Sequence, residues 1–242
     1  MYHPAMESVG SPVSSAPYHP PPPLRRTWQE ALVLTLTGVL LTASFYHARV
    51  PGLVDRDRLL AWVGINFALL FVIPVVVIKL VLRRRLSEFG LRWGRAWIWG
   101  RYLLVFLLVL VPVIVISAQW PSFQGYYSNH LWALESPGQF MLFAAAWLVY
   151  FFAWEFFFRG FMLFSLVRSM GALAIFVQTI PFTMMHFNKP PMECYSAVIA
   201  GIALGLMAYR GRSFIGCWLL HWVIALLMYT MVLLKSDLPI YP

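Results

Sequence analysis

The sequence predicts an all-α protein, a polytopic transmembrane helix bundle of about seven spans. Hydrophobic residues make up 61% of the 242 residues and charged residues only 11%, with a mean hydropathy of +0.73. A soluble domain of this length could not hide so much apolar surface in one core, whereas a bilayer accommodates it. The apolar residues also form long runs, separated by basic or proline-containing loops, of the length that a helix needs to cross a bilayer.

The N-terminal half contains a tail followed by three of these runs. Residues 1–27 are rich in Pro, Ser, Tyr and His and lack hydrophobic periodicity, which is typical of a disordered tail. Trp28 then serves as an interface anchor, and Pro74 is a kink that neighbouring helices tolerate in a membrane span. We expect the first three spans at residues 31–46, 59–82 and 97–118.

Four more runs follow in the C-terminal half, at residues 140–167, 172–186, 195–209 and 214–234. The pair Pro190-Pro191 stops the helix before it, because neither residue has an N–H to donate. The sixth run contains Gly201 and Gly205, small residues one turn apart that suit close contact between helices.

The basic residues indicate the orientation of the bundle. Segment 83–101 is the most cationic loop, whereas segment 119–139 contains no Lys or Arg. The positive-inside rule places the former in the cytoplasm and the latter outside, with a cytoplasmic N-terminus and an external C-terminus. The formal charge of +9 therefore reflects topology and anionic lipid headgroups. We do not expect nucleic-acid binding, because the basic residues lie between hydrophobic spans.

Five ionisable residues lie inside or at the edge of the expected spans: Glu155, Arg159, His186, Glu193 and His221. On insertion scales a charge at the centre of a span costs roughly 2.5–3.5 kcal/mol, so such residues are candidates for a functional site. Glu155 and Arg159 are four residues apart, share one helix face and can pair. Because lipid exposure would be costly for each residue, we expect all five to face one polar, catalytic cavity inside the bilayer.

Such a cavity suits hydrolysis of a carbonyl compound by a water that a glutamate activates. The phenylalanines next to Glu155 disfavour its charged form, whereas Arg159 favours it. These opposing effects suit a general base. Two imidazoles could orient the water, donate to an oxyanion or protonate a leaving amine. Ser165 and Ser196 lie near helix ends, where packing or capping explains them, so no nucleophile with a base partner stands out.

Three segments in this order resemble the motifs of the CPBP superfamily of intramembrane proteases, which includes the CAAX-processing endopeptidases. They are Trp154-Glu155-Phe-Phe-Phe-Arg159-Gly160, Phe182-Thr-Met-Met-His186, and His221 in the last span. The family motifs read Glu-Glu-x-x-x-Arg, Phe-x-x-x-His, and a late His that is often followed four residues on by Asn. The resemblance covers residues 140–234. Trp154 stands where the family has its first Glu, commonly regarded as catalytic, and Ala225 stands where it often has Asn.

The resemblance implies a glutamate-dependent membrane endopeptidase that needs no metal or cofactor and acts on a membrane-anchored protein or peptide. Glu155 would be the general base, Arg159 would hold it, His186 would assist, and His221 would help to form the oxyanion site. Residues 28–139 would then be the N-terminal transmembrane helices with their basic loop. Residues 140–235 would form the catalytic bundle and residues 236–242 a C-terminal tail.

Segment 186–193, together with Trp-Glu in the first motif, resembles the myxosortase-like branch of this superfamily. Those proteins are thought to cut C-terminal sorting tails made of a short motif, a transmembrane helix and a basic end. This resemblance implies a multi-pass protein of the bacterial inner membrane. It also implies that Glu193 joins the site or replaces the missing carboxylate.

Other interpretations of these residues stay open. Glu155, His186 and His221 could form a two-histidine, one-carboxylate zinc site, although no His-Glu-x-x-His spacing is present and Arg159 would oppose a cation. The chain could instead be a non-catalytic protein of the bacteriocin-immunity type, which also occurs in the superfamily, or could relay protons. The sequence does not indicate an oligomeric state.

Overall fold

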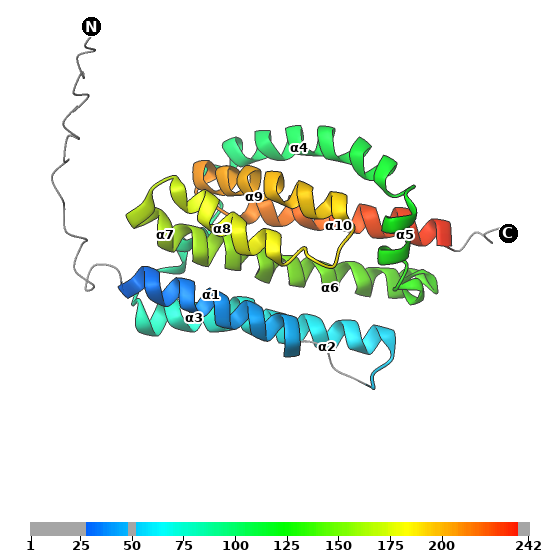
Figure 1. Ribbon diagram of the computed structural model, residues 1–242, viewed down its shortest axis with the longest axis horizontal. Coiled ribbons are helices and arrows are strands. Elements are labelled where there is room, and N and C mark those ends of the chain that lie inside the picture. The colour runs from blue at the N-terminus through cyan, green and yellow to red at the C-terminus, as the bar shows by residue number, and fades with distance from the viewer. Residues whose placement is uncertain (1–27, 48–51, 237–242) are drawn as a thin grey trace, which may run out of the picture.

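The computed structural model describes residues 28–47 and 52–236, and every regular element in these segments is a helix (Figure 1). The predicted tail 1–27 and residues 237–242 of the predicted C-terminal tail lie outside the described residues. The first half contains α1 (Trp28–His47), α2 (Asp55–Phe67), η2 (Ala68–Val72), α3 (Ile73–Val76), η3 (Val77–Val81), η4 (Leu86–Phe89) and α4 (Ala96–Ser117). The second half contains α5 (Pro121–Tyr127), η5 (Leu131–Leu134), α6 (Pro137–Glu155), η6 (Phe156–Met162), α7 (Leu163–Met170), α8 (Leu173–Met184), α9 (Pro191–Gly211) and α10 (Ile215–Ser236).

The expected all-α polytopic bundle is confirmed. Six helices in the described segments are long and apolar enough to cross a bilayer. The span predicted at residues 172–186 is the exception, because α8 has 12 residues. At about 1.5 Å per residue it is roughly 18 Å long, against a hydrocarbon core of about 30 Å. The fifth pass therefore consists of a short helix and the turn 185–190 that follows it.

The second span is one continuous helix, Asp55–Val81, made of α2, η2, α3 and η3. Pro74 has no N–H to donate to the carbonyl one turn earlier, so the regular α-helical hydrogen-bond pattern is interrupted there. The turns on both sides of Pro74, η2 and η3, are π-helical. The proline is thus accommodated by wider turns within an unbroken helix.

The longest helix, Pro137–Met170, joins α6, η6 and α7 over 34 residues. It begins with Pro137 in the first turn, while the Ser136 hydroxyl accepts a hydrogen bond from the Gln139 amide at 3.2 Å. The π-helical segment η6 starts directly after Glu155. A Cβ on Gly160 would lie 2.9 Å from the Phe89 carbonyl oxygen, so only glycine allows η4 to pack this closely against the helix.

Helices α8 and α9 pack closely through the small residues that the sequence indicated. A Cβ on Gly201 would lie 2.6 Å from the Thr179 methyl carbon, and one on Gly205 would lie 2.9 Å from the Gln178 side chain. The Gln178 amide donates to the Gly201 carbonyl at 2.8 Å. The close contact predicted for Gly201 and Gly205 is therefore present, and it fixes α8 against α9.

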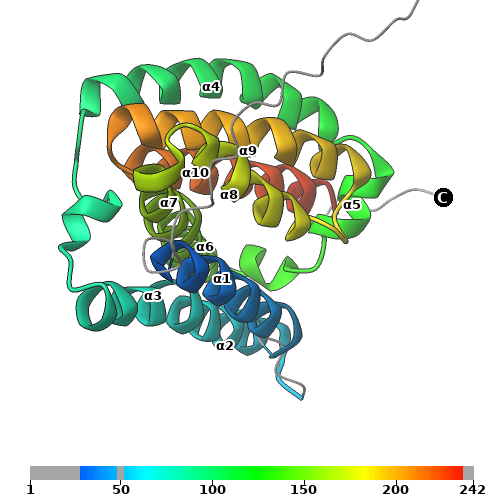
Figure 2. The same ribbon diagram turned by 60° about the vertical axis from the view of Figure 1, so that its left-hand side comes forward.

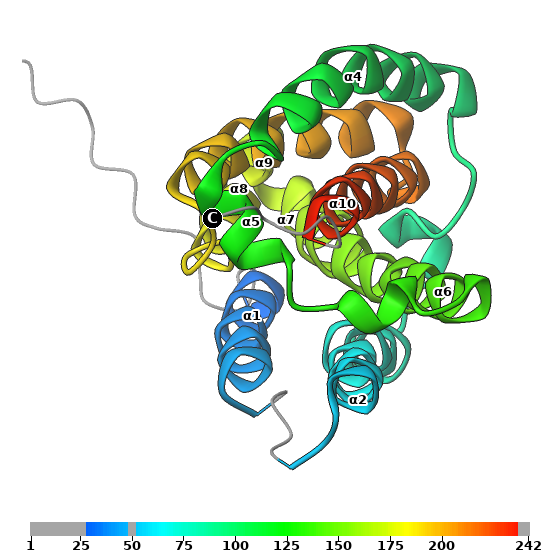
Figure 3. The ribbon, with the colours of Figure 1, turned by 90° about the vertical axis from the view of Figure 1, so that its right-hand side faces the viewer.

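The two ends of the bundle differ in charge. Figures 1 and 2 show that α4 covers one side of the bundle, that α1 and α2 cover the opposite side, and that α6, α9 and α10 lie between them. One end carries the cationic loop 83–95 with Arg168 and Arg212, whereas α5 and η5 lie at the other end. Figure 3 looks onto that second end, with α5 in front of the bundle. Helix α1 begins at the basic end and α10 ends at the opposite one, which fits an odd number of passes (Figure 1).

Candidate active site

Glu155 is the centre of a buried hydrogen-bond network at the junction of α6 and η6. Its Oε1 atom accepts from the Arg159 guanidinium at 3.1 Å and lies 2.6 Å from His221 Nδ1. Glu155 and Arg159 are both 0% exposed, so the predicted ion pair forms and lies entirely inside the protein. A carboxylate at this distance from Nδ1 places the N–H there, which leaves His221 Nε2 as the free ring nitrogen.

Helix α10 brings His221 to Glu155 because two tryptophans hold α10 against α6. The indole of Trp218 donates to the Leu148 carbonyl and the indole of Trp222 to the Ala144 carbonyl, both at 2.9 Å. The imidazole of His221 stacks on Phe151 of α6, with ring centroids 4.2 Å apart. Trp218 is thus a packing residue between α10 and α6.

His186 lies just beyond the end of α8, and its Nδ1 is 2.8 Å from the Phe182 carbonyl oxygen. A carbonyl only accepts, so Nδ1 carries the hydrogen and Nε2 is again the free nitrogen. The indole of Trp154 contacts both histidines, with ring centroids 6.0 Å from His186 and 6.4 Å from His221. Trp154 therefore fills the space that a carboxylate at this position would share with both imidazoles.

Arg159 is held in place by aromatic contacts in addition to Glu155. Its guanidinium carbon lies 3.9 Å from the centre of the Phe182 ring, a cation–π geometry that partly compensates for lost hydration. The Nε and Nη2 atoms of Arg159 and the Oε2 atom of Glu155 are buried without a hydrogen-bond partner among the described residues. The pair thus retains unused hydrogen-bonding capacity next to His221.

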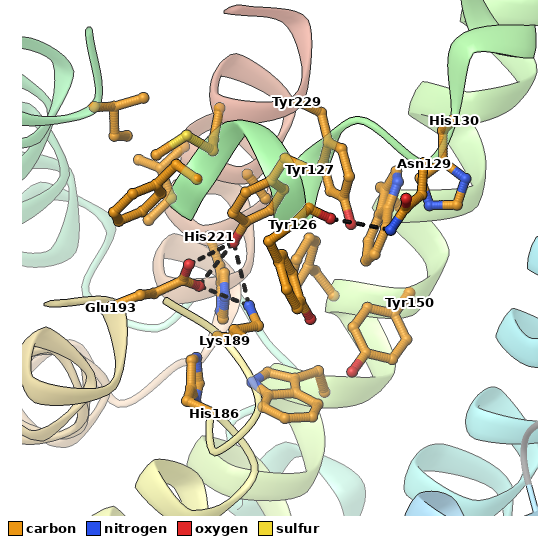
Figure 4. Close-up of a pocket in the computed structure, with 18 of the residues that line it drawn as sticks. Tyr126, Tyr127, Asn129, His130, Tyr150, His186, Lys189, Glu193, His221 and Tyr229 are labelled. Carbon is orange, nitrogen blue, oxygen red and sulfur yellow. Dashed lines mark hydrogen bonds and ion pairs between the residues drawn. The ribbon is translucent and has the colours of Figure 1, made fainter. Parts of the chain in front are cut away.

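Glu193, in the first turn of α9, forms a second cluster (Figure 4). Its carboxylate accepts from the Tyr127 hydroxyl, at 2.8 and 2.7 Å for its two oxygens, and from Lys189 at 2.7 Å. Burial and the nearby carboxylate raise the pKa of Tyr127 well above its usual value, so the hydroxyl stays a donor. Lys189 and Tyr127 therefore fix the position of the Glu193 carboxylate.

A cavity of about 1680 Å³ connects these groups. Trp154, His186, Glu193 and His221 line it, whereas Glu155 and Arg159 do not. Adjacent residues of a helix point about 100° apart, so Trp154 faces the cavity while Glu155 faces the protein behind it. Of the five residues expected to share one cavity, three face it, and the other two support His221 from behind.

The rest of the cavity wall is largely aromatic. Trp62, Tyr150 and Tyr229 belong to it, and Figure 4 shows Tyr229 next to Tyr127 of the Glu193 cluster. On α4 and α9 the cavity reaches residues at the outer surface, Val109 at 59% exposed and Ile199 at 73% exposed. The cavity wall thus includes α5 at one end of the bundle and extends to the side that lipid would cover.

Two residues of the site were not recognised in the sequence. Lys189 lies four residues before Glu193, a spacing typical of an ion pair, and the pair forms in the structure. Tyr127 lies 66 residues from Glu193 along the chain and carries no local signal for this contact. In residues 28–47 and 52–236 no three His, Cys, Asp or Glu side chains are grouped so as to hold a metal ion.

The fold and the site together define a polytopic helical membrane protein with a carboxylate–histidine pair buried within the bundle. Residues 136–227 match the family described as Rce1-like, type II CAAX prenyl endopeptidase. The match extends from Ser136, at the start of α6, into α10 and includes all five predicted site residues. It supports a CAAX-type intramembrane protease activity in general and agrees with the resemblance to the CPBP superfamily. No curated protein and no solved structure matches the chain.

Proposed function

We propose that this protein is an intramembrane endopeptidase that hydrolyses a peptide bond of a membrane-anchored substrate, using a water activated by the Glu155–His221 pair. One observation carries the proposal. Glu155 is fully buried and lies 2.6 Å from His221 Nδ1, while His221 itself lines the cavity. This arrangement lets a carboxylate act on a substrate that it does not touch, as the buried carboxylate of a catalytic triad does.

In this mechanism Glu155 is a positioning residue and His221 is the general base. Glu155 holds the Nδ1–H tautomer, and Arg159 holds the Glu155 carboxylate in position. The Nε2 atom of His221 takes a proton from water as the water oxygen bonds to the scissile carbonyl carbon. His186 Nε2 accepts a hydrogen bond from the second O–H of that water. As the tetrahedral intermediate collapses, the C–N bond breaks and His221 returns the proton to the leaving amine.

Glu193 is the competing carboxylate, because it lines the same cavity. Both of its oxygens accept hydrogen bonds from Tyr127, and one also accepts from Lys189, so a water would have to displace these contacts to reach the carboxylate. We therefore assign to Glu193 and Lys189 the role of a charged pair that contacts the polar backbone of the substrate. The alternative role, in which Glu193 is itself the base, makes a different prediction for the same set of variants.

The position of the cavity in the bundle indicates what kind of membrane protein could be the substrate. Residues of α5 and η5 line the cavity, at the end of the bundle opposite the basic loops, and the positive-inside rule would place that end outside the cytoplasm. Its exposed wall at Val109 and Ile199 would admit a segment from the bilayer. A C-terminal sorting signal on a bacterial inner-membrane protein, cut near the outer surface, fits both features.

The test compares membrane proteins from a strain that lacks the gene with those from strains carrying the wild-type gene or single variants. The substrate is the membrane protein that stays larger in the deletion strain and is shortened when the wild-type gene is restored. Glu155→Gln and His221→Ala should each leave it uncut, and Glu193→Gln should retain cleavage. Glu88→Gln, a matched change at the basic end, should cleave as the wild type does.

Three results would contradict the proposal. Loss of cleavage in Glu193→Gln with full cleavage in Glu155→Gln would make Glu193 the base. An inactive wild type together with an active Trp154→Glu variant would mean that the base has been lost from this chain. Cleavage by purified protein that stops in chelator and returns with zinc would replace the glutamate mechanism with a metal one.

A further inference from the structure

A small basic pocket lies at the opposite end of the bundle from the catalytic cavity. It has a volume of about 330 Å³ and lies where α4 begins and α9 ends. Its lining residues are Arg95, Ile98, Tyr209, Arg210 and Arg212, so three guanidinium groups and no carboxylate surround it. None of the three arginines forms an ion pair with a carboxylate in residues 28–47 and 52–236.

Hydrogen bonds between two distant segments fix the backbone around this pocket. The Arg95 amide donates to the Gly211 carbonyl at 2.7 Å, and the Arg92 guanidinium donates to the Arg212 carbonyl at 3.1 Å. Gly94 lies so close to the carbonyl oxygens of Gly211 and Arg212 that no side chain fits there. The backbone that carries the pocket arginines is therefore held in place where the start of α4 meets the end of α9.

Arg212 occupies a backbone conformation that favours glycine. It follows the last turn of α9 with φ +51° and ψ +36°, the left-handed position at which helices usually end in glycine. An arginine at such a position is strained, which points to a use for its side chain. Arg210, the second arginine of the same turn, donates from Nη1 to the Tyr102 hydroxyl at 2.7 Å, which holds its guanidinium at the edge of α4.

The surface next to the pocket is apolar and exposed. On α4, Trp97 is 64% exposed and Leu104 and Leu108 are 59% and 68% exposed. Only 11% of the apolar window of this helix is buried inside the protein, so most of its surface would contact lipid. A charged group in the pocket would thus lie at the head of a long apolar surface, as the headgroup of a lipid does relative to its acyl chains.

We propose that this pocket binds a phosphate group, supplied by an anionic phospholipid whose acyl chains lie along α4. Guanidinium groups recognise phosphate oxygens through paired, charge-assisted hydrogen bonds, and basic pockets on the cytoplasmic side of helix bundles suit anionic headgroups. Free phosphate offers the same chemistry without the acyl chains. The site is independent of the proposed protease activity.

The test measures binding to the purified full-length protein in neutral detergent, by thermal unfolding and by titration. The probes are short-chain phosphatidylglycerol, phosphatidylcholine of the same chain length, and inorganic phosphate. Phosphatidylglycerol should raise the unfolding temperature more than phosphatidylcholine does, and inorganic phosphate should bind more weakly. Arg95→Gln and Arg212→Gln should each weaken phosphatidylglycerol binding by on the order of tenfold, the worth of one lost charge-assisted contact.

Arg101→Gln is the matched control, since it removes one positive charge from the same end of the bundle but lies outside the pocket. It should bind phosphatidylglycerol as the wild type does. Tighter binding of inorganic phosphate than of phosphatidylglycerol would assign the pocket to a free anion and overturn the lipid assignment. Equal losses of phosphatidylglycerol binding in Arg101→Gln and Arg212→Gln would show that the pocket is not the binding site. Equal binding of the two lipids would show the same.

Discussion

Glu155 and Arg159 place two opposite charges at a fully buried position, so replacing either residue alone should strongly lower the stability of the protein. Removing one partner of a buried ion pair leaves an uncompensated charge, which costs about 3–5 kcal/mol, whereas removing both can be nearly neutral. Catalysis and stability therefore respond differently to the same pair. Comparing the stability and the activity of single and double variants therefore distinguishes a functional pair from one that only supports the fold.

We predict that Glu155→Leu alone lowers the free energy of unfolding by about 3–5 kcal/mol, because Arg159 is then buried without a counter-charge. The double variant Glu155→Leu with Arg159→Met should recover most of that loss but remain inactive, because His221 has lost the group that positions it. Thermal unfolding in detergent measures the first effect and substrate cleavage the second. A stable double variant that still cleaves would show that the pair has only a structural role.

The sequence predicted this part of the site because charges in an apolar run are conspicuous. The pairing of Glu155 with Arg159 follows from helical spacing, and the structure contains it. Which face of the helix meets the cavity depends on how α6, η6 and α10 pack, and local spacing does not determine that. The sequence therefore identified His221 and Glu155 as candidates without revealing that one lies behind the other.

At the scale of helices, the position of His186 depends on the contact between α8 and α9. His186 lies just beyond the end of α8, and α8 is held by the close approach of Gly201 to Thr179. A helix of 12 residues is too short to be fixed by both membrane interfaces, so its depth depends on its neighbour. The glycines of α9 are thus part of what places the second imidazole.

We predict that Gly201→Ala destabilises the protein by about 1–3 kcal/mol, the usual cost of overpacking, because the new Cβ would lie 2.6 Å from Thr179. Cleavage should also fall, because a shift of about 1 Å in His186 is enough to disturb catalysis. Gly64→Ala is the matched control, with no atom within 4 Å of the new Cβ. If both variants unfold at the same temperature, the α8–α9 contact does not carry the stability assigned to it.

Tyr127 links helix α5 to Glu193 and to α10 at the wall of the cavity. The Tyr127 hydroxyl reaches both oxygens of Glu193, and the Tyr127 ring packs edge-to-face on Tyr229 of α10 at 4.8 Å. Segment 119–139 had no predicted structure beyond its lack of basic residues. Its role depends on a contact across 66 residues, which no local pattern reveals.

We predict that Tyr127→Phe costs about 1.5–3 kcal/mol, because it removes a hydrogen bond to a charged group while keeping the ring. Amide hydrogen exchange should become faster in α5 (Pro121–Tyr127) and remain unchanged in α6. The neighbouring variant Tyr126→Phe removes a hydroxyl that does not contact Glu193 and should have little effect. Unchanged exchange in α5 would mean that other contacts hold this helix.

Across the whole molecule, composition was sufficient to predict the class of fold, because a bilayer is the only environment that accepts so much apolar surface. Six of the seven predicted spans correspond to long apolar helices. The remaining one, predicted at residues 172–186, differs because hydropathy measures the length of an apolar run and not where the helix ends. Helix α8 ends at Met184, and the turn 185–190 completes the pass. That turn carries Lys189 and leads into Glu193, so the irregular pass supplies one of the two polar clusters of the cavity.

The orientation of the bundle in the membrane decides which of its two ends, the basic end or the end that bears α5, is external. We predict that Ser122 of α5 and the C-terminus are external, because seven passes with the basic loops in the cytoplasm would place them there. A reporter that is active only outside the cytoplasm should be active when fused after the last residue, and a cysteine in place of the exposed Ser122 should react with a membrane-impermeant label in intact cells. The same cysteine placed at Ser87, near the basic end, should react only after the cells are opened. The reverse pattern would place the catalytic cavity on the cytoplasmic face and exclude a sorting signal cut at the outer surface.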